Sequence, residues 1–341
     1  MPDTSVVSTP LDIASIIEEF PILHQKVNGK PLVYFDNAAT NQKPKSVISA
    51  LSAHYEQDNA NIHRGIHTLA ERSTTAFEDT RKAVQAFINA NEAEEVIFTK
   101  GTTESINLVA SSYGRKFIQA EDEIIISGLE HHSNIVPWQL VAEEKGAHIK
   151  VIPVLDNGEL DLITFETLLS EKTKVVAINH ASNSLGTINP IRMITEKAHE
   201  VGAVVMIDGA QGAAHLEIDV RKMNVDFYAF GSHKMYGPTG VGILYGKRSL
   251  LEKMPPYQGG GEMIKEVSFE KTTYNDIPYK FEAGTPNIAD VNALKAAIDF
   301  INDLGKENIA EYEKELTQYA TERIQEIEGL KIIGDCEEKV A

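Results

Sequence analysis

The sequence contains one cysteine, Cys336, so an internal disulfide and a zinc site of the multi-cysteine type are both excluded. No stretch approaches the run of about 20 apolar residues that crosses a membrane. The first residues lack the basic segment and the continuous apolar segment of a signal peptide. From these absences we predict no export, no membrane insertion and a location in the reducing cytoplasm.

Basic residues are scarce: 32 Lys and Arg face 50 Asp and Glu, which gives a formal net charge of −18 at pH 7. The resulting field repels nucleic acid and anionic lipid, and we predict neither as a partner. An anionic ligand could bind only where a helix N-terminus or a local cationic pocket overrides that field. The remaining composition, 42% hydrophobic and 24% charged over 341 residues, argues against disorder, collagen or a coiled coil.

Short β-branched runs alternate with amphipathic helical stretches from Glu95 onward, a pattern typical of a mainly parallel sheet covered by helices. The runs are almost continuously apolar, which predicts that both faces of the sheet are buried. We expect seven strands, at 95–99, 122–127, 148–154, 174–179, 203–208, 226–230 and 240–245. Helices are expected at 69–88, 103–113, 190–199, 291–304 and 309–327.

The predicted fold class is therefore α/β, with a mainly parallel seven-stranded sheet in a large domain at 21–290. A smaller α+β domain would combine 1–20 with 291–341. It looks incomplete, because a further strand is expected at 330–334, just before the sequence stops. The segment 246–290 is irregular and rich in Gly and Pro, which predicts a functional excursion of the large domain.

Polar clusters follow several of the predicted strands at their carboxyl ends, where open α/β sheets bind their ligands. We expect them to meet on one rim of the sheet. The clusters are Gly101–Glu104, Glu130–Asn134, Asn179–Gly186, Asp208–Gln211 and Gly231–Gly240.

Lys234 and Asp208 are the central pair of this rim. A partly desolvated lysine loses its proton readily and can form a Schiff base, although Lys234 alone could be an ordinary exposed lysine. Asp208 ends the preceding predicted strand, and a carboxylate there would keep the pyridine nitrogen of pyridoxal phosphate protonated. Alone it could be a turn residue before a glycine. Together the two residues predict a pyridoxal phosphate site.

A cradle for the cofactor's phosphate is predicted where Gly101, Thr102 and Thr103 join a strand to a helix, because free N–H groups at a helix N-terminus bind anions. The same residues could serve only as a helix cap. Ser232 and His233 could add donors.

Other rim residues could contact the ring itself. His131 or His132 could stack on the face of the ring. Asn183 and Gln211 could donate hydrogen bonds to its phenolic oxygen. Each of these residues alone could equally be an ordinary rim or core residue.

Competing motifs fit poorly. A phosphate-binding loop of the nucleotide hydrolases would need glycine at 241 and Ser or Thr at 248, where Val241 and Arg248 stand. His63 and His67 have a metal-like spacing, but the glutamate of the zinc-protease motif is missing, and we predict no metal site. No GxSxG nucleophile elbow is present.

Eight motifs, in order along the chain, resemble the SufS-type group II cysteine desulfurases, members of the class V aminotransferase group of fold-type I pyridoxal phosphate enzymes. The resemblance extends over essentially the whole chain, from about Phe20 to Gly334. The motifs are YFDNAATNQKP (34–44), NIHRGIHTLA (61–70), GTTESINLVA (101–110), EHHSNIVPWQ (130–139), SNSLGTINP (182–190), DGAQ (208–211), SHKMYGPTGVGILYG (232–246) and FEAGTPN (281–287).

The resemblance implies roles for residues of this sequence. Lys234 would bind the cofactor covalently and shuttle the substrate's proton, Asp208 would hold the pyridine nitrogen, and His131 would cover the ring. Asn183 and Gln211 would bind the phenolic oxygen. Thr103 and His233 would bind the phosphate, joined by Thr285 from the neighbouring subunit of a homodimer. Arg64 would reach across the dimer interface toward the partner's active site.

The implied activity is conversion of L-cysteine to L-alanine, with persulfide sulfur passed to an acceptor of the SufE or SufU type for iron–sulfur cluster assembly. Two departures stand out. Gly231 replaces the family's phosphate-binding serine, three positions before Lys234, and the hydroxyl of Ser232 could substitute for it. The family's sulfur-accepting cysteine loop and its carboxylate-binding arginine have no counterpart here, so we expect a truncated chain with impaired persulfide chemistry. Cys336 does not match that loop, and its acidic neighbours would raise the pKa of a thiol.

Three interpretations stay open at this point: the desulfurase, another class V reaction such as selenocysteine lyase acting on L-selenocysteine or an aminotransferase, and a non-catalytic dimer that kept the fold.

Overall fold

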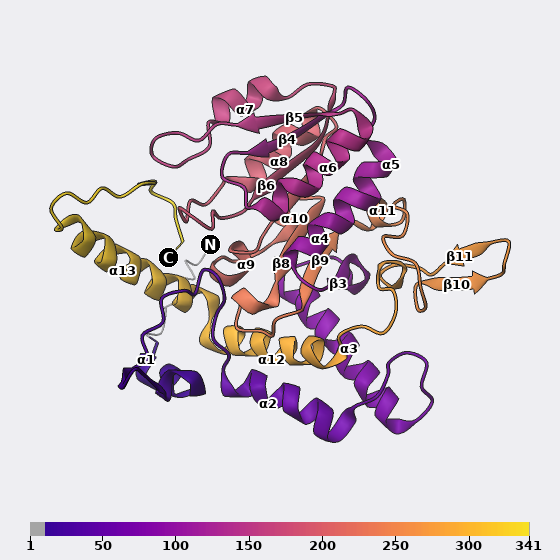
Figure 1. Ribbon diagram of the computed structural model, residues 1–341, viewed down its shortest axis with the longest axis horizontal. Coiled ribbons are helices and arrows are strands. Elements are labelled where there is room, and N and C mark those ends of the chain that lie inside the picture. Colours follow the sequence, from indigo (N-terminus) through magenta and orange to yellow (C-terminus); the bar gives the residue numbers. More distant parts are fainter. Residues whose placement is uncertain (1–10, 341) are drawn as a thin grey trace, which may run out of the picture.

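The computed structural model describes residues 11–340 (Figure 1), so residues 1–10 and 341 of the predicted small domain lie outside the described part. Its centre is a seven-stranded sheet with the order β3-β9-β8-β7-β6-β4-β5. Strands β4 to β8 pair in parallel, and β9 runs antiparallel to both of its neighbours. The predicted mainly parallel α/β sheet is confirmed. Its strands are β3 (Val96–Thr99), β4 (Glu123–Ser127), β5 (His148–Ile152), β6 (Thr173–Asn179), β7 (Val204–Asp208), β8 (Phe227–Gly231) and β9 (Gly242–Gly246).

Both faces of the sheet are buried, as the apolar runs predict. In β6, Val175 and Ala177 join one hydrophobic cluster while Val176 and Ile178 join the other. This alternation follows from the two-residue period of a strand. The first cluster also contains the apolar residues of helices α4 and α6, and the second those of α3, α8 and α12. The sheet is therefore the middle layer of three.

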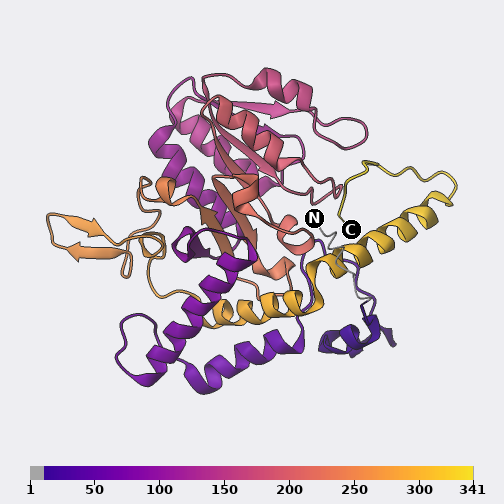
Figure 2. The ribbon, with the colours of Figure 1, turned by 180° about the vertical axis from the view of Figure 1, so that it is seen from behind.

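The long helices lie where the helical periodicity predicts them, within a few residues at each end. Figures 1 and 2 show α12 and α2 side by side along one edge of the molecule, and α13 extending away from it. The helices are α1 (Ile13–Glu18), α2 (Lys45–Ala53), α3 (Thr68–Phe87), α4 (Thr102–Val109), α5 (Arg115–Phe117), α6 (Val136–Lys145), α7 (Leu162–Leu168), α8 (Ile191–Glu200), α9 (Gly212–His215), α10 (Val220–Met223), α11 (Arg248–Leu251), α12 (Ile288–Leu304) and α13 (Lys306–Gln325). None of those in residues 11–340 is both long and apolar enough to cross a bilayer.

The predicted strand at 330–334 is wrong. That segment has no regular structure, and the nearest pairing is a single bridge between Thr187 and Lys339. Ile333 is 77% exposed, so this short apolar run has no partner strand to cover it within the described residues. The division of the chain at residue 290 stays a prediction. The apolar side of α12, including Leu294 and Ile298, packs into the same cluster as the sheet.

The irregular segment after β9 contains a two-stranded antiparallel hairpin, β10 (Ile264–Val267) with β11 (Thr272–Tyr274), which projects from the body of the molecule in Figures 1 and 2. Phe269 in its turn is fully exposed. The hairpin therefore presents apolar surface that no other part of residues 11–340 covers.

A close approach of two backbones holds the start of α4 against the sheet. A Cβ atom at Gly242 of β9 would lie 2.4 Å from backbone atoms of Gly101, the residue that caps α4. Only glycine at 242 leaves that space. The loop before α4 can therefore cross directly over β9.

We expect Gly242→Ala to destabilise the protein by about 2 kcal/mol, because the added methyl group must push the loop at Gly101 off the strand. Urea denaturation followed by circular dichroism would measure the change in the free energy of unfolding. Gly259→Ala is the matched control, since a Cβ there meets nothing within 4 Å. Equal stability of the two variants would contradict the explanation.

Candidate active site

A cavity of about 830 Å³ opens at the carboxyl ends of the parallel strands. Most of the predicted site residues converge on it, although they come from segments far apart in the sequence. The predicted residues that line it are Thr102, Thr103, His131, Asn183, Asp208, Gln211, His233 and Lys234. Ser232, Arg64 and Thr285 lie elsewhere.

Asp208 is the buried acid of the cavity. It is the last residue of β7 and is only 4% exposed. One carboxylate oxygen accepts the backbone N–H of Ala210 at 3.0 Å, and the other accepts the hydroxyl of Ser133 at 3.4 Å. Burial raises the pKa of Asp208, while these hydrogen bonds and the charges of His131 and Lys234 act against it. A positive charge placed beside this carboxylate would stabilise its ionised form.

Lys234 supplies the amine. It follows β8, the neighbour of β7, so the two strand ends bring Lys234 and Asp208 to the same cavity. Desolvation lowers the pKa of Lys234, and the charge of Asp208 acts in the opposite direction. In the part of the chain that the structure describes, its amine has no hydrogen-bond or ion-pair partner. A half-buried amine with a lowered pKa is a competent nucleophile.

The backbone at Lys234 is held by a segment that the sequence analysis used only as a family motif. The side-chain amide of Asn41 donates to the carbonyl of Lys234 at 2.6 Å, and its backbone N–H donates to the carbonyl of His233 at 3.0 Å. The amine of Lys43 donates to that same His233 carbonyl at 3.0 Å, and burial lowers its pKa to about 8. This clamp fixes the direction in which Lys234 leaves the chain.

The predicted phosphate cradle is present as an N-terminal helix end. Helix α4 begins at Thr102 with Gly101 as its cap, and Thr103 and Glu104 follow in the first turn beside the cavity. Free N–H groups and the helix dipole make this end attractive to an anion. Glu104 is turned back, because its carboxylate accepts the backbone N–H of Lys100 at 2.6 Å.

Ser232 does not contribute to this cradle. It is fully buried and does not line the cavity, and its hydroxyl donates to the carbonyl of Pro238. The suggestion that Ser232 takes the place of the family's serine is therefore not supported by its geometry. Position 231 is closer to the cradle than Ser232, because a Cβ at Gly231 would lie 3.2 Å from the Thr102 hydroxyl and 3.3 Å from the ring of His233.

We expect Gly231→Ser to slow the loss of a bound phosphorylated cofactor about threefold, since one added hydroxyl can donate to the phosphate once Thr102 shifts by a few tenths of an ångström. Dialysis of the loaded protein, followed by absorbance, would measure the rate of loss. A faster loss than in the unaltered protein would show that crowding of Thr102 and His233 outweighs the added donor.

His131 is oriented by its neighbour Ser133. The backbone N–H of Ser133 donates to His131 Nδ1 at 3.2 Å, and the Ser133 hydroxyl lies 2.8 Å from the same nitrogen. Nδ1 therefore accepts, and this assigns the ring proton to Nε2. Ser133 also contacts Asp208, so one serine connects the imidazole with the buried acid. Sequence reasoning missed Ser133, although it lies inside the EHHSN motif. His132, the alternative, does not line the cavity.

Asn183 and Gln211 differ in how firmly they are held. Gln211 is buried, and its amide donates to the carbonyl of Ala38 at 3.0 Å. Asn183 is exposed at the mouth of the cavity. Asn179, which sequence reasoning did not single out, also lines the cavity and is buried. Its register opposite Asp208 in the parallel pair of β6 and β7 would have identified it.

Glu130 supports this wall from behind. Its carboxylate accepts the Ser127 hydroxyl at 2.5 Å, the Asn134 amide at 2.6 Å and the backbone N–H of Asn179 at 2.9 Å. Burial raises the pKa of Glu130 to about 8 despite these hydrogen bonds, and the nearby charge of Asp208 adds to the shift. The residue therefore connects the ends of β4 and β6.

Arg64 and Thr285 share a different location. Both line a small hollow of about 120 Å³ together with Gly261 and Glu262, and neither lines the cavity that contains Lys234. Thr285 also lines a second cavity, of about 500 Å³, that adjoins the first at Lys100, Glu104, Gly240 and Tyr257.

Cys336 is buried, and its thiol contacts the Thr187 hydroxyl at 3.3 Å and the carbonyl of Glu338 at 3.5 Å. It does not line the cavity.

Comparison with known proteins supplies the family. A family model described as aminotransferase class V matches residues 33–341. The chain belongs to the class-V aminotransferase family. A probable cysteine desulfurase of Halalkalibacterium halodurans is 52% identical over 315 residues, which cover 92% of this chain and 78% of that protein.

Other relatives are longer. A cysteine desulfurase of Synechococcus elongatus is 50% identical over 97% of this chain and 53% of its own length, and a probable cysteine desulfurase of Mycolicibacterium paratuberculosis is 51% identical over 48% of its own length. The chain thus spans about half the length of these two relatives.

Solved structures agree with the fold. The crystal structure of the cysteine desulfurase CsdA (S-sulfonic acid) from Escherichia coli has a TM-score of 0.87 at 39% identity, over 94% of this chain and 79% of that one. The apo cysteine desulfurase of Thermococcus onnurineus NA1 has a TM-score of 0.88 at 36% identity, over 94% of this chain and 78% of that one.

The residues that line the Lys234 cavity of this class-V aminotransferase fit pyridoxal phosphate. Within residues 11–340 the amine of Lys234 has no hydrogen-bond or ion-pair partner, the buried carboxylate of Asp208 makes no ion pair, and the first turn of α4 offers N–H groups for a phosphate. Each of the three features matches one part of the cofactor: its aldehyde, its pyridine nitrogen and its phosphate.

We expect Asp208→Asn to move the pH dependence of cofactor binding to lower pH. The charge of Asp208 raises the pKa of Lys234, so its removal lowers that pKa further and makes the neutral, reactive amine available in more acidic solution. The rate of absorbance growth after adding excess pyridoxal phosphate, measured against pH, should show a midpoint about one pH unit lower. Asp156→Asn, an exposed loop residue, is the control. A midpoint that stays or rises would contradict this coupling.

Proposed function

We propose that this chain is a pyridoxal phosphate-dependent cysteine desulfurase that converts L-cysteine to L-alanine and passes the sulfur to a thiol. The observation that carries the proposal is the convergence of Lys234 and Asp208 on one cavity, each with its pKa shifted by burial. Relatives and solved structures named cysteine desulfurase support the choice of substrate.

When bound, pyridoxal phosphate supplies an electron sink that weakens the bonds at the α carbon of an amino acid. Asp208 would face the ring nitrogen of the bound cofactor, because its buried carboxylate is stabilised by a cation beside it. The amine of Lys234 would take and return the substrate proton at Nζ. His131 lines the cavity, and its Nε2 carries the ring proton because Nδ1 accepts the backbone N–H of Ser133.

The sulfur step needs a thiol outside the described cavity. In L-cysteine + R–SH → L-alanine + R–S–SH, the carbon–sulfur bond breaks, a sulfur–sulfur bond forms, and a proton reaches the β carbon of alanine. Cys336 is buried against Thr187 and away from the cavity, so we assign it no part in this step. An acceptor of the SufE or SufU type would carry the sulfur to iron–sulfur cluster assembly in the cytoplasm.

A homodimer would complete the site. Arg64 and Thr285 share a hollow and do not line their own chain's Lys234 cavity, which suits residues that serve the partner's cavity. Near them Ile66 is 97% exposed, and Phe269 of the projecting hairpin is fully exposed. Apolar side chains in such positions are stabilised when a second copy covers them.

The decisive variant is Lys234→Ala. With pyridoxal phosphate, L-cysteine and dithiothreitol as the acceptor thiol, we expect the unaltered protein to release alanine and sulfide. In the variant, alanine formation should fall by about a thousandfold and the visible absorbance band of the covalently bound cofactor should be absent, because the proton-shuttling amine is gone.

Cys336→Ala is the matched control and should keep both the absorbance band and alanine formation. Faster release of alanine from L-selenocysteine than from L-cysteine would favour a selenocysteine lyase, and keto-acid formation would favour an aminotransferase. If Lys234→Ala does not change cofactor binding and no amino acid is turned over, the protein is a non-catalytic dimer that kept the fold.

A further inference from the structure

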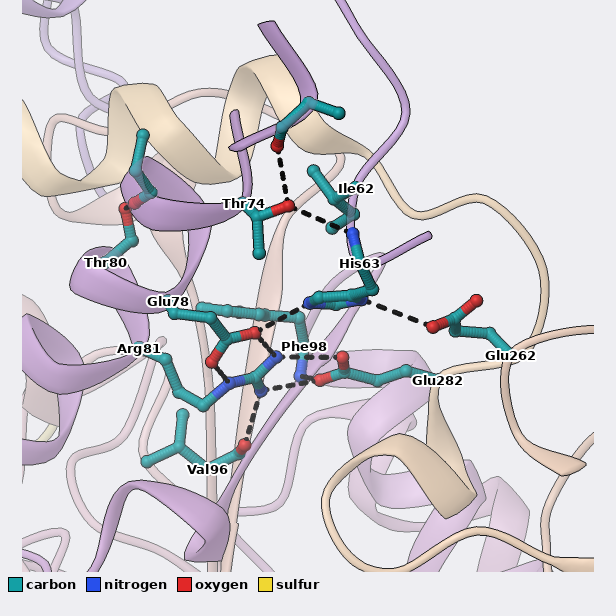
Figure 3. A network of polar contacts seen from close by, with 12 residues as sticks. Ile62, His63, Thr74, Glu78, Thr80, Arg81, Val96, Phe98, Glu262 and Glu282 are labelled. Carbon is teal, nitrogen blue, oxygen red and sulfur yellow. Dashed lines mark hydrogen bonds and ion pairs between the residues drawn. The ribbon is translucent and has the colours of Figure 1, made fainter. Parts of the chain in front are cut away.

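A buried polar network stands apart from the cofactor cavity, with Arg81 of α3 at its centre (Figure 3). The Arg81 side chain is only 1% exposed, and its guanidinium lies 4.6 Å from the ring centroid of Phe98. A charge buried this deeply requires complete pairing.

That pairing is complete. Arg81 Nε donates to Glu78 at 2.9 Å, Nη1 donates to the Val96 carbonyl and to Glu282 at 2.8 Å each, and Nη2 donates to Glu282 at 2.9 Å and Glu78 at 3.3 Å. All five guanidinium donors are therefore used. Glu282 also accepts the backbone N–H of Phe98 at 2.8 Å. The fork of paired bonds leaves this centre no freedom to rotate.

The network continues from Glu78 through His63 to Glu262, and both ring nitrogens of His63 face carboxylates. His63 Nε2 lies 3.0 Å from Glu78, and Nδ1 lies 3.4 Å from Glu262 (Figure 3). Burial alone would raise the pKa of Glu78, but hydrogen bonds from His63 and Arg81 and the charge of Arg81 lower it to about 2. The imidazole thus lies between two partly buried carboxylates, with side-chain exposures of 24% for Glu78 and 20% for Glu262.

Backbone strain marks the two bridging residues. His63 and Glu262 both have a backbone φ of +67°, a left-handed conformation that residues other than glycine rarely adopt. Strain of this kind persists where surrounding contacts over-determine the backbone. For His63 one such contact is its backbone N–H, which donates to the Thr74 hydroxyl at 3.0 Å.

The far end of the network is Arg64, whose Nε lies 2.9 Å from Glu262. The Arg64 side chain is 61% exposed, whereas that of Glu262 is only 20% exposed. At the other end, Glu282 stands three residues before Thr285, which lines the same hollow as Arg64. One rigid centre thus sets the place of both residues that face a partner.

We propose that Glu262 and His63 are positioning residues, through which the buried Arg81–Glu282 pair holds the guanidinium of Arg64 beside Thr285 in the orientation needed at the partner's cavity. This inference rests on the proposed function, in which Arg64 serves the substrate site of the second subunit. A solvent-exposed arginine without such a partner would sample many rotamers, and ordering it on binding would cost free energy. The Glu262 carboxylate removes most of that cost beforehand.

The test compares Glu262→Gln, Arg64→Ala and the double variant in the cofactor-loaded protein. We expect Glu262→Gln to raise KM for L-cysteine about fivefold with kcat, the cofactor absorbance and the melting temperature unchanged. In the Arg64→Ala background the same change should have no further effect, because the two residues act as a unit. His63→Asn, which tolerates a left-handed backbone, should raise KM in the same direction.

A second readout does not depend on turnover. Phenylglyoxal modifies free arginine side chains, and peptide mass spectrometry would follow its reaction with Arg64. Glu262→Gln should accelerate this reaction several-fold, while Glu266→Gln, an exposed glutamate on the same hairpin, should not. An unchanged rate of Arg64 modification in Glu262→Gln would overturn the inference, and so would effects on KM that add in the double variant. In either case, alanine formation by the unaltered protein would still support the proposed function. Accelerated modification without alanine formation by the unaltered protein would overturn the proposed function and support the positioning of Arg64.

Discussion

The site depends on the burial of a carboxylate, Asp208, and an amine, Lys234, in one cavity at the carboxyl ends of the strands. Parallel pairing of β7 with β8 makes this unavoidable, because Asp208 and Lys234 leave the sheet at its same edge. Burial works against the charge on each group, and each charge partly offsets that effect for the other. A cofactor with an aldehyde at one end of a conjugated ring and a basic nitrogen at the other satisfies both groups. Desolvation disfavours the charged form of each residue. For Lys234 it thereby favours the neutral, nucleophilic amine.

The surrounding structure keeps this pair in place instead of adding further chemistry. Asn41 holds the backbone of Lys234, and Ser133 connects Asp208 with His131. Gly242 allows the phosphate loop to cross the sheet at close range. The Arg81 network performs a similar task for the face that would meet a second subunit. In both places, buried polar groups held by hydrogen bonds and ion pairs orient a more exposed functional side chain.

Much of this was predictable from the sequence. The seven strands follow from apolar runs of the right length, and polar clusters at their carboxyl ends identify the rim. The strand at 330–334 failed because an apolar run indicates only a tendency, and Ile333 meets no neighbouring strand. Ser232 failed for a related reason: a hydroxyl in the right loop can turn to a nearby carbonyl, and here it donates to Pro238.

The fold class, the rim and the acid–amine pair can be predicted from the amino-acid sequence, because strand periodicity and the identity of residues at strand ends are local properties. The side chains that support them are known only from the folded chain. The bond from Asn41 to Lys234 joins residues 193 positions apart, and the pair of Arg81 with Glu282 joins residues 201 apart. No local pattern encodes such contacts. They arise when the packing of α3 and the loops against the sheet buries polar groups, each of which must then find a partner.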